Sequence, residues 1–114
     1  MTYDLWDIVL VPFPFTDLST NKKRPALIIS PKDYNSGPDV LVMFVTSKLN
    51  RNKRPGDYTI KSWKEAGLPK ASMTRMKLAT LDKTLILKKF ARLKPEDIYG
   101  VKECLKEFLD IEAG

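Results

Sequence analysis

Short apolar segments, separated by proline, glycine, asparagine and aspartate, recur through the first 90 residues of the chain. Segments of this kind, rich in valine, isoleucine, leucine and phenylalanine, are typical of strands in a compact sheet or barrel. The ranges expected to be strands are 8–13, 25–30, 40–45, 58–60, 72–81 and 84–90. Residues 40–45 are almost wholly apolar, which predicts a central strand. The pattern therefore predicts a mainly β fold.

The links between these strands contain the residue types that turns favour. Residues 16–23 predict a polar loop, and the basic segment 48–56 predicts an exposed one. Residues 62–67 predict one helical turn, capped by Ser62 and ended by a glycine. Residues 82–83 predict a tight turn that joins the last two strands.

The final segment has a different spacing of apolar residues. Pro95 suits the first turn of a helix, and Glu96 and Asp97 complement its positive end. Four apolar residues then recur at helical spacing: Ile98, Val101, Leu105 and Phe108. We expect one amphipathic helix that packs across the open side of the sheet. No repeat or linker divides the chain, so residues 1–114 are expected to form a single domain.

The net charge of +6 is unevenly distributed. Residues 95–114 carry six acids and two bases, which leaves a net charge of +10 on the preceding 94 residues. A surface this basic attracts polyanions through counterion release, and RNA or DNA is the obvious candidate. Lysine enrichment for solubility alone remains the alternative.

The residues that the chain lacks exclude several kinds of chemistry. It has no histidine and a single cysteine, Cys104, so histidine-dependent catalysis and a zinc or iron–sulfur site are excluded. Cys104 cannot form an internal disulfide and is expected to be a buried thiol. We expect no cofactor and no metal. No apolar run is long enough to cross a bilayer, and a cytoplasmic location is expected.

The side chains that remain suit phosphate chemistry. RNA provides its own nucleophile, the 2′-hydroxyl next to the scissile phosphate. A protein that cleaves RNA must then hold the reacting groups in line and neutralise the charge that builds on the phosphate oxygens. Arginine suits this task better than lysine, because its planar donors can bind two phosphate oxygens together.

Three segments carry a resemblance to a known family. They are DIVLVPFPFTDL at 7–18, KKRPALIIS at 22–30 and FVTSK at 44–48, and weaker matches extend through LATLD at 78–82 to the predicted helix. This order resembles the MazF/PemK/Kid family of toxins over nearly the whole chain. The resemblance implies an SH3-like antiparallel β-barrel, the MazF/CcdB-like toxin fold, with a C-terminal α-helix. It also implies a homodimer that cleaves single-stranded mRNA without metal and is inhibited by an antitoxin protein.

Carried over to this chain, the resemblance implies that Arg24 and Thr46 are catalytic. Arg24 would bind the scissile phosphate and protonate the leaving 5′-oxygen, and Thr46 would hydrogen-bond the same phosphate. Without the resemblance, a solvated charge in a basic trio is the favoured interpretation of Arg24, and an ordinary β-branched strand residue is an equally good interpretation of Thr46. The residues expected to bind RNA are Phe15, Lys22, Lys23, Ser47, Lys48, Arg75 and Lys77.

The chain departs from the family pattern in two places. Some relatives carry a basic and an acidic residue two places apart on the strand matching 72–81, where they serve as acid and base. This chain has Arg75 and Lys77 there, with no carboxylate before Asp82, so the general base is not identified. Arg75 and Lys77 should share one face of the strand and bind phosphates. Trp6 stands where the family usually has glycine.

Two neighbouring aromatic residues, Phe13 and Phe15, precede the basic loop. Phe15 is expected to stack on RNA bases, whereas core packing is expected for Phe13.

Two alternative functions remain open. A catalytically inactive relative that binds nucleic acid would explain the missing carboxylate. A gyrase poison like CcdB shares the fold, but that family acts through a tryptophan close to the C-terminus. Here both tryptophans, Trp6 and Trp63, lie elsewhere.

Overall fold

The structure is a computed structural model that describes residues 2–13, 22–49 and 53–111. Its six strands are β1 (Asp7–Pro12), β2 (Lys23–Ile28), β3 (Asp39–Thr46), β4 (Tyr58–Thr59), β5 (Met73–Asp82) and β6 (Lys88–Arg92). Its helices are α1 (Lys32–Asn35), α2 (Trp63–Ala66) and α3 (Pro95–Leu109), with a 3₁₀ turn, η1, at Lys83–Leu85.

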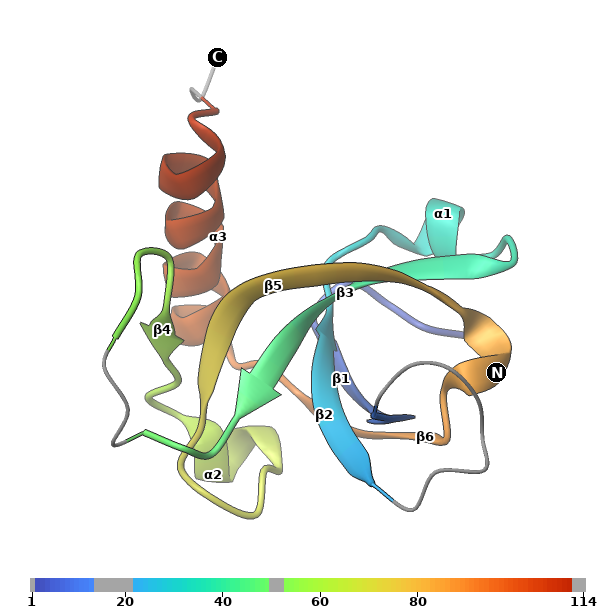
Figure 1. Cartoon of the computed structure of the whole chain (residues 1–114), viewed down its shortest axis with the longest axis horizontal. Coiled ribbons are helices and arrows are strands. Elements are labelled where there is room, and N and C mark those ends of the chain that lie inside the picture. Colours follow the sequence, from blue (N-terminus) through green and yellow to red (C-terminus); the bar gives the residue numbers. More distant parts are fainter. Residues whose placement is uncertain (1, 14–21, 50–52, 112–114) are drawn as a thin grey trace.

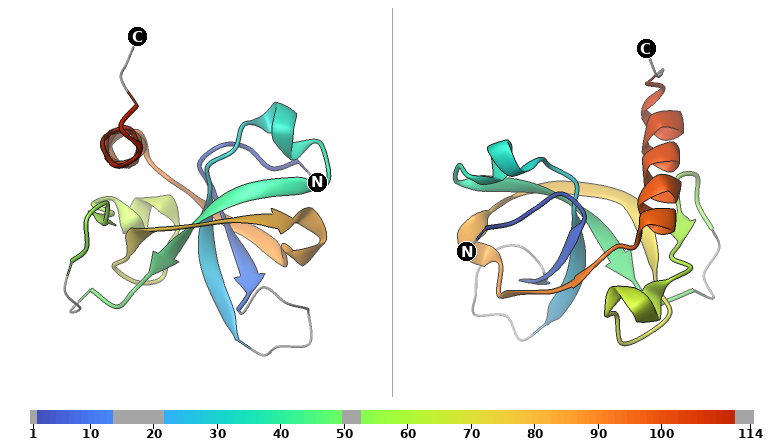
Figure 2. Two further views of the ribbon diagram at one scale, coloured as in Figure 1. Left: turned by 45° about the horizontal axis from the view of Figure 1, so that its top comes forward. Right: turned by 180° about the vertical axis from the view of Figure 1, so that it is seen from behind.

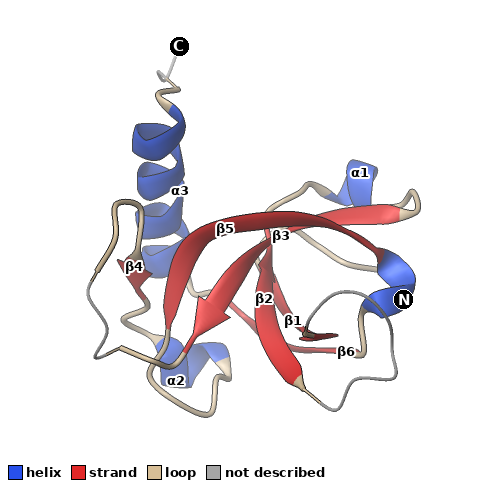
Figure 3. Cartoon of the chain, in the orientation of Figure 1, coloured by secondary structure: helices blue, strands red, loops and turns tan. Residues whose placement is uncertain are grey.

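The strands form one antiparallel sheet in the order β4-β5-β3-β2-β1-β6. The sheet curls into a half-barrel, with β5 arching over β3 and β2 (Figure 1). Figure 3 shows that the strands make up the body of the molecule and that the helices lie around it. The predicted barrel-like, mainly β fold with a C-terminal helix is confirmed. Residues 40–45 lie in β3, which pairs with β2 and β5, so the predicted central strand is confirmed as well.

The inner strands are apolar because both faces of the sheet are covered. Successive side chains of a strand point to opposite faces. In β1, Ile8 belongs to one buried cluster and Val9 to another. The first cluster also includes Leu27, Met43, Val45, Ile60, Leu93 and Val101, and the second includes Val11, Ala26, Ile28, Val40, Val42 and Leu81.

The predicted tight turn at residues 82–83 is wrong. β5 and β6 do not pair with each other, because β5 lies between β3 and β4 and β6 pairs with β1. Asp82, the last residue of β5, instead caps the start of η1, and its side chain accepts a hydrogen bond of 2.9 Å from the backbone N–H of Thr84. A local turn signal shows where a strand ends, but the pairing partner is decided by long-range packing.

The helical turn predicted at 62–67 is present as α2, and its glycine end is confirmed. Gly67 has a φ of 104°, a conformation that residues with a Cβ rarely adopt. The predicted capping role of Ser62 is wrong. Its hydroxyl donates instead to Glu96 Oε1 of α3 at 2.6 Å, so it links the two helices.

The helix predicted from Pro95 is confirmed as α3. Its first turns pack on the first cluster through Val101, with Ile98 and Leu105 beside it. The helix stands at the β4 end of the sheet and projects past it, rather than lying across the sheet as predicted (Figure 2). Cys104, on this helix, is half-buried, and burial raises the pKa of its thiol.

Trp6 has a φ of 78°, in the left-handed region that residues with a Cβ rarely adopt. Its side chain is buried in the first cluster. Its backbone N–H donates to Ile28 O at 2.8 Å, and its carbonyl accepts from Leu93 N at 3.1 Å. Glycine adopts this conformation without strain, which gives a physical reason for a glycine at the matching position of relatives.

Within the described ranges, no helix is both long and apolar enough to span a membrane.

Candidate functional site

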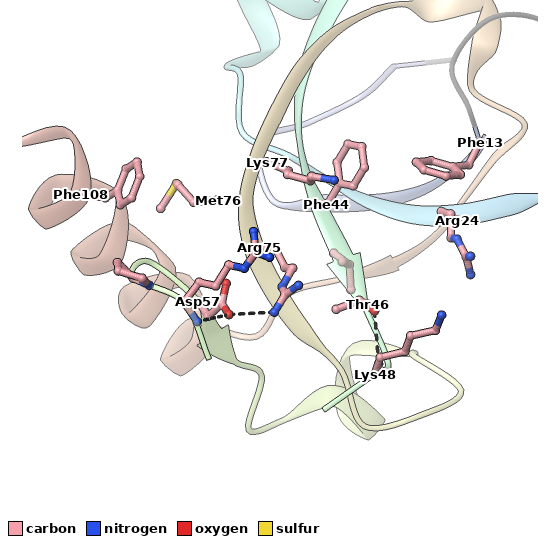
Figure 4. Close-up of a pocket in the computed structure, with 13 residues that line it drawn as sticks. Phe13, Arg24, Phe44, Thr46, Lys48, Asp57, Arg75, Met76, Lys77 and Phe108 are labelled. Atoms are coloured by element: carbon pink, nitrogen blue, oxygen red, sulfur yellow. Dashed lines mark hydrogen bonds and ion pairs between the residues drawn. The ribbon is translucent and has the colours of Figure 1, made fainter. Parts of the chain in front are cut away.

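A cavity of about 540 Å³ opens where β2, β3 and β5 meet the segment before β4 (Figure 4). Five cationic side chains line it: Arg24, Lys48, Arg54, Arg75 and Lys77. Among the described residues, Asp57 is the single carboxylate of the lining. An open cavity with this balance of charges favours a ligand that carries several negative charges, such as a nucleic-acid backbone.

The pairing of β2 with β3 brings Arg24 and Thr46 to the same end of the sheet. Ala26 pairs with Phe44, and each strand continues by two residues to Arg24 and Thr46. Both residues line the cavity. Arg24 is exposed, while Thr46 is half-buried and its Oγ1 accepts a hydrogen bond of 3.2 Å from the backbone N–H of Lys48. An exposed cation and a hydrogen-bonded hydroxyl thus lie at one wall of the cavity.

Two aromatic rings contact two of the five cationic side chains of the cavity. Phe13 and Phe44 pack edge to face, with ring centroids 6.0 Å apart. The guanidinium carbon of Arg24 lies 5.7 Å from the Phe13 centroid, and Lys77 Nζ lies 5.7 Å from the Phe44 centroid. Such cation–π contacts restrain long side chains that would otherwise be mobile.

The prediction that Phe13 packs in the core is wrong. Phe13 is half-buried and lines the cavity, and it belongs to neither buried cluster. It directly follows the last residue of β1, beyond the part of the strand that the two buried clusters cover. Its backbone N–H donates to Lys22 O at 3.0 Å, which holds it opposite the start of β2.

An ion pair joins Asp57 to Arg75 across the cavity wall. Asp57 Oδ2 lies 3.2 Å from a terminal nitrogen of Arg75 and also accepts a hydrogen bond of 2.8 Å from the backbone N–H of Arg54. Asp57 was not predicted from the sequence, because it comes from a different segment from the strand that carries Arg75. The signal was an aspartate directly after the basic Pro-Gly loop, which is too common a pattern to point to a site.

A second cavity of about 490 Å³ shares Arg24, Val45, Thr46 and Lys48 with the first. Its other polar lining residues are Ser47, Lys70, Ser72 and Lys88, and no described residue of the lining is acidic. Arg24 and Thr46 therefore lie on a wall between two cationic hollows. A polyanion passing from one hollow to the other would cross them.

The remaining predicted residues occupy different positions. Arg75 and Lys77 both line the first cavity, as expected for residues on one face of β5. Ser47 and Lys48 are exposed, and Ser47 lines the second cavity whereas Lys48 lines both. Lys22 and Lys23 are exposed at the start of β2 but line neither cavity, and Phe15 lies outside the described residues.

The described residues contain no group of three or more acidic or cysteine side chains arranged to hold a metal ion. Trp63 is partly buried and packs against the first buried cluster.

The sequence profile of the PemK-like, MazF-like toxins of type II toxin–antitoxin systems matches residues 4–109. The chain belongs to this family. None of the curated proteins compared with it matches significantly. The family match at residues 4–109 includes every strand and helix of the described residues, and it includes the residues that line both cavities.

Several solved structures share the fold of this toxin. A MazE–MazF complex from Deinococcus radiodurans aligns with a TM-score of 0.76 and 21% identity, covering 98% of this chain and 99% of that one. An endoribonuclease in complex with its cognate antitoxin, from a mycobacterial species, aligns with a TM-score of 0.76, 17% identity and coverage of 98% and 99%. The Mycobacterium tuberculosis toxin MazF-mt6 aligns with a TM-score of 0.73, 15% identity and coverage of 94% and 99%.

Proposed function

We propose that this toxin is an endoribonuclease that cleaves single-stranded RNA at Arg24 and Thr46. The observation that carries the proposal is the position of these two residues on the wall shared by two cationic cavities. Family membership supports it, as does the description of a structure with the same fold as an endoribonuclease. The backbone of an RNA strand would lie across this wall, with flanking nucleotides in the two hollows.

The proposed reaction is transfer of the phosphate within the RNA. The 2′-oxygen forms a bond to the adjacent phosphorus as the bond to the 5′-oxygen breaks, which leaves a 2′,3′-cyclic phosphate and a 5′-hydroxyl. One proton passes from the 2′-hydroxyl to solvent water, and one reaches the 5′-oxygen. Arg24 neutralises the charge that builds on the phosphate and protonates the leaving oxygen, and Thr46 hydrogen-bonds the phosphate.

The cationic side chains of the two cavities can attract phosphate without a metal ion. The five cations of the first cavity and the cations of the second surround the proposed position of the scissile group. The chain has no histidine and one cysteine. We therefore propose that cleavage proceeds without a bound metal.

The proposed partners are single-stranded RNA and a cognate antitoxin, with the toxin acting as a homodimer. Two structures with this fold are described as complexes with an antitoxin. An acidic antitoxin segment would compete with RNA for the same cavities, because both are polyanions.

The test is to incubate the purified toxin with a long RNA in excess EDTA and to map the new ends. New 5′-hydroxyl and 2′,3′-cyclic phosphate ends are expected. Arg24→Ala is expected to reduce the cleavage rate by about 100- to 1000-fold, the usual effect of removing one charge-stabilising donor. Lys32→Ala is the control, since Lys32 is an exposed cation of α1 that lines neither cavity.

Two outcomes would contradict the proposal. Cleavage that stops in EDTA and returns with a divalent metal would overturn the metal-free mechanism. RNA that the wild type binds but leaves intact would identify the chain as an inactive, nucleic-acid-binding relative.

A further inference from the structure

We propose that Asp57 is a positioning residue that holds the guanidinium of Arg75 toward the scissile phosphate. It would thus provide, from the segment before β4, a carboxylate for Arg75, because the acidic residue of β5, Asp82, lies at the far end of that strand. The proposal rests on the proposed function, because it assigns a role within the same cavity.

The two partners of the ion pair differ in exposure. The side chain of Asp57 is 2% exposed, whereas that of Arg75 is 21% exposed, and both residues line the first cavity. In the view of Figure 4, Arg75 extends from β5 to Asp57, and Thr46 lies between this pair and Arg24. The carboxylate is therefore covered by the protein, while the guanidinium it binds retains surface that a ligand can reach.

This exposure argues against Asp57 as the general base. A base must come within hydrogen-bonding distance of the hydroxyl that it deprotonates. The covered carboxylate of Asp57 already binds Arg75 and the backbone N–H of Arg54 through Oδ2. Its effect on the reaction must pass through Arg75.

An arginine gains from such a partner because its side chain is long and flexible. A charge-assisted hydrogen bond to one terminal nitrogen restricts the rotamers, so the direction of the remaining donors is set before RNA binds. Donors fixed in advance stabilise a transition state without further reorganisation. Arg24 and Lys77 are restrained by aromatic rings, and Arg75 is restrained by Asp57.

Asp57 also has a local structural role that the test must separate from positioning. Its Oδ2 accepts from Arg54 N at 2.8 Å, and its own N–H donates to Arg54 O at 3.0 Å, which closes the turn at residues 54–57. Asparagine retains a side-chain oxygen that can accept from Arg54 N. Asp57→Asn therefore removes the charge of the ion pair while preserving the turn.

The experiment measures single-turnover cleavage of a short RNA by the full toxin and its variants, together with the Kd for the same RNA carrying a 2′-deoxy group at the scissile position. Asp57→Asn is expected to reduce the cleavage rate by about 10- to 100-fold, as expected for a misplaced charged group. The Kd should stay unchanged or fall, because the variant removes a negative charge from a cationic cavity. Loss of rate together with tighter binding cannot arise from weaker electrostatic attraction.

A double variant tests whether Asp57 acts through Arg75. If it does, Asp57→Asn should add little to the loss caused by Arg75→Ala. Arg75→Lys, which keeps the charge but loses the planar donors, should fall between wild type and Arg75→Ala.

Asp7→Asn is the matched control. Asp7 has a side chain 5% exposed and pairs with Arg92 at 2.9 Å and with Lys89 at 3.4 Å, yet it lines neither cavity. Its loss should change Tm but not the cleavage rate of the folded protein.

Three results would overturn the proposal: wild-type cleavage by Asp57→Asn, a full additional loss in the Arg75→Ala background, or an equal rate loss in Asp7→Asn. In each case the wild type still cleaves, so the proposed function survives. A wild type that does not cleave would overturn the proposed function and the role of Asp57 together.

Discussion

Asp57 and Asp97 both have almost fully buried side chains, yet their partners differ in charge. Asp97 is 0% exposed and accepts from three uncharged donors: Tyr58 Oη at 2.6 Å, Lys61 N at 2.9 Å and Ser62 N at 2.8 Å. Asp57 pairs with a guanidinium that lines an open cavity.

The difference separates a carboxylate that holds the fold from one placed beside a functional surface. Asp97 lies in the first turn of α3 and binds groups of β4 and of the link to α2, so it fastens the helix to the sheet. The fully buried carboxylate of Asp97 is held by neutral donors and lines neither cavity. A carboxylate that fixes a partly exposed arginine controls a group that a ligand can contact.

Among the variants that test this comparison, Asp97→Ala is expected to have the largest effect on the free energy of unfolding. The change leaves Tyr58 and two backbone N–H groups without their acceptor, and each buried donor left unpaired costs about 1–3 kcal/mol. We expect a loss of roughly 3 kcal/mol or more in the free energy of unfolding, measured by urea denaturation. Glu96→Ala is the control, because Glu96 is the exposed neighbour and its loss should cost far less. A near-normal stability of Asp97→Ala would remove the distinction between the two carboxylates.

Gly100→Ala is expected to lower the free energy of unfolding by a smaller amount. A Cβ at residue 100 would lie 2.2 Å from Cε1 of Tyr58, so the ring that binds Asp97 would have to move. Overpacking of this kind costs about 1–3 kcal/mol. The cost should shrink in a Tyr58→Ala background, where the clash is absent. Equal costs in both backgrounds, measured by thermal unfolding, would show that the helix does not depend on this contact.

The smallest effect concerns the pH dependence of the Asp97 contact. Burial, together with the hydrogen bond to the Asp97 carboxylate, raises the pKa of Tyr58 well above its ordinary value. The folded state therefore keeps the Tyr58 proton at a pH where the unfolded chain releases it. The stabilisation is fully present below about pH 10, the ordinary tyrosine pKa, and is lost as the pH rises through the higher folded pKa.

The measurement is the free energy of unfolding of wild type and Tyr58→Phe through this alkaline range. Wild type should lose stability more steeply than the variant, and parallel curves would contradict the raised pKa. Near neutral pH the variant should be less stable by roughly 1 kcal/mol, the usual value of one hydrogen bond.

Much of the fold could be predicted because its signals are local. The apolar runs of β1, β2 and β3 and the helical spacing from Pro95 are consequences of which side chains need to be buried. Gly67 could be assigned to a helix end because few other residues adopt its backbone conformation. The tight turn at residues 82–83 was predicted wrongly, since turn residues do not specify which strand the following segment pairs with.

Part of the candidate site could also be predicted from the sequence, and part could not. Arg24, Thr46, Arg75 and Lys77 were identified from the sequence, and all of them line the first cavity, although their catalytic and RNA-binding roles remain predictions. Asp57 was not identified, because it comes from a different segment from Arg75, 18 residues away in the chain.

The sequence by itself determined the class of fold, the helix at its end, the family and the cationic character of the surface. These follow from composition, from periodicity and from motifs that are contiguous in the chain. Only the tertiary structure decided which carboxylate meets Arg75, because a buried ion pair depends on the distance between atoms brought together by folding. The carboxylate that lies 3.2 Å from Arg75 is Asp57, 18 residues away in the sequence, rather than Asp82 at the end of β5.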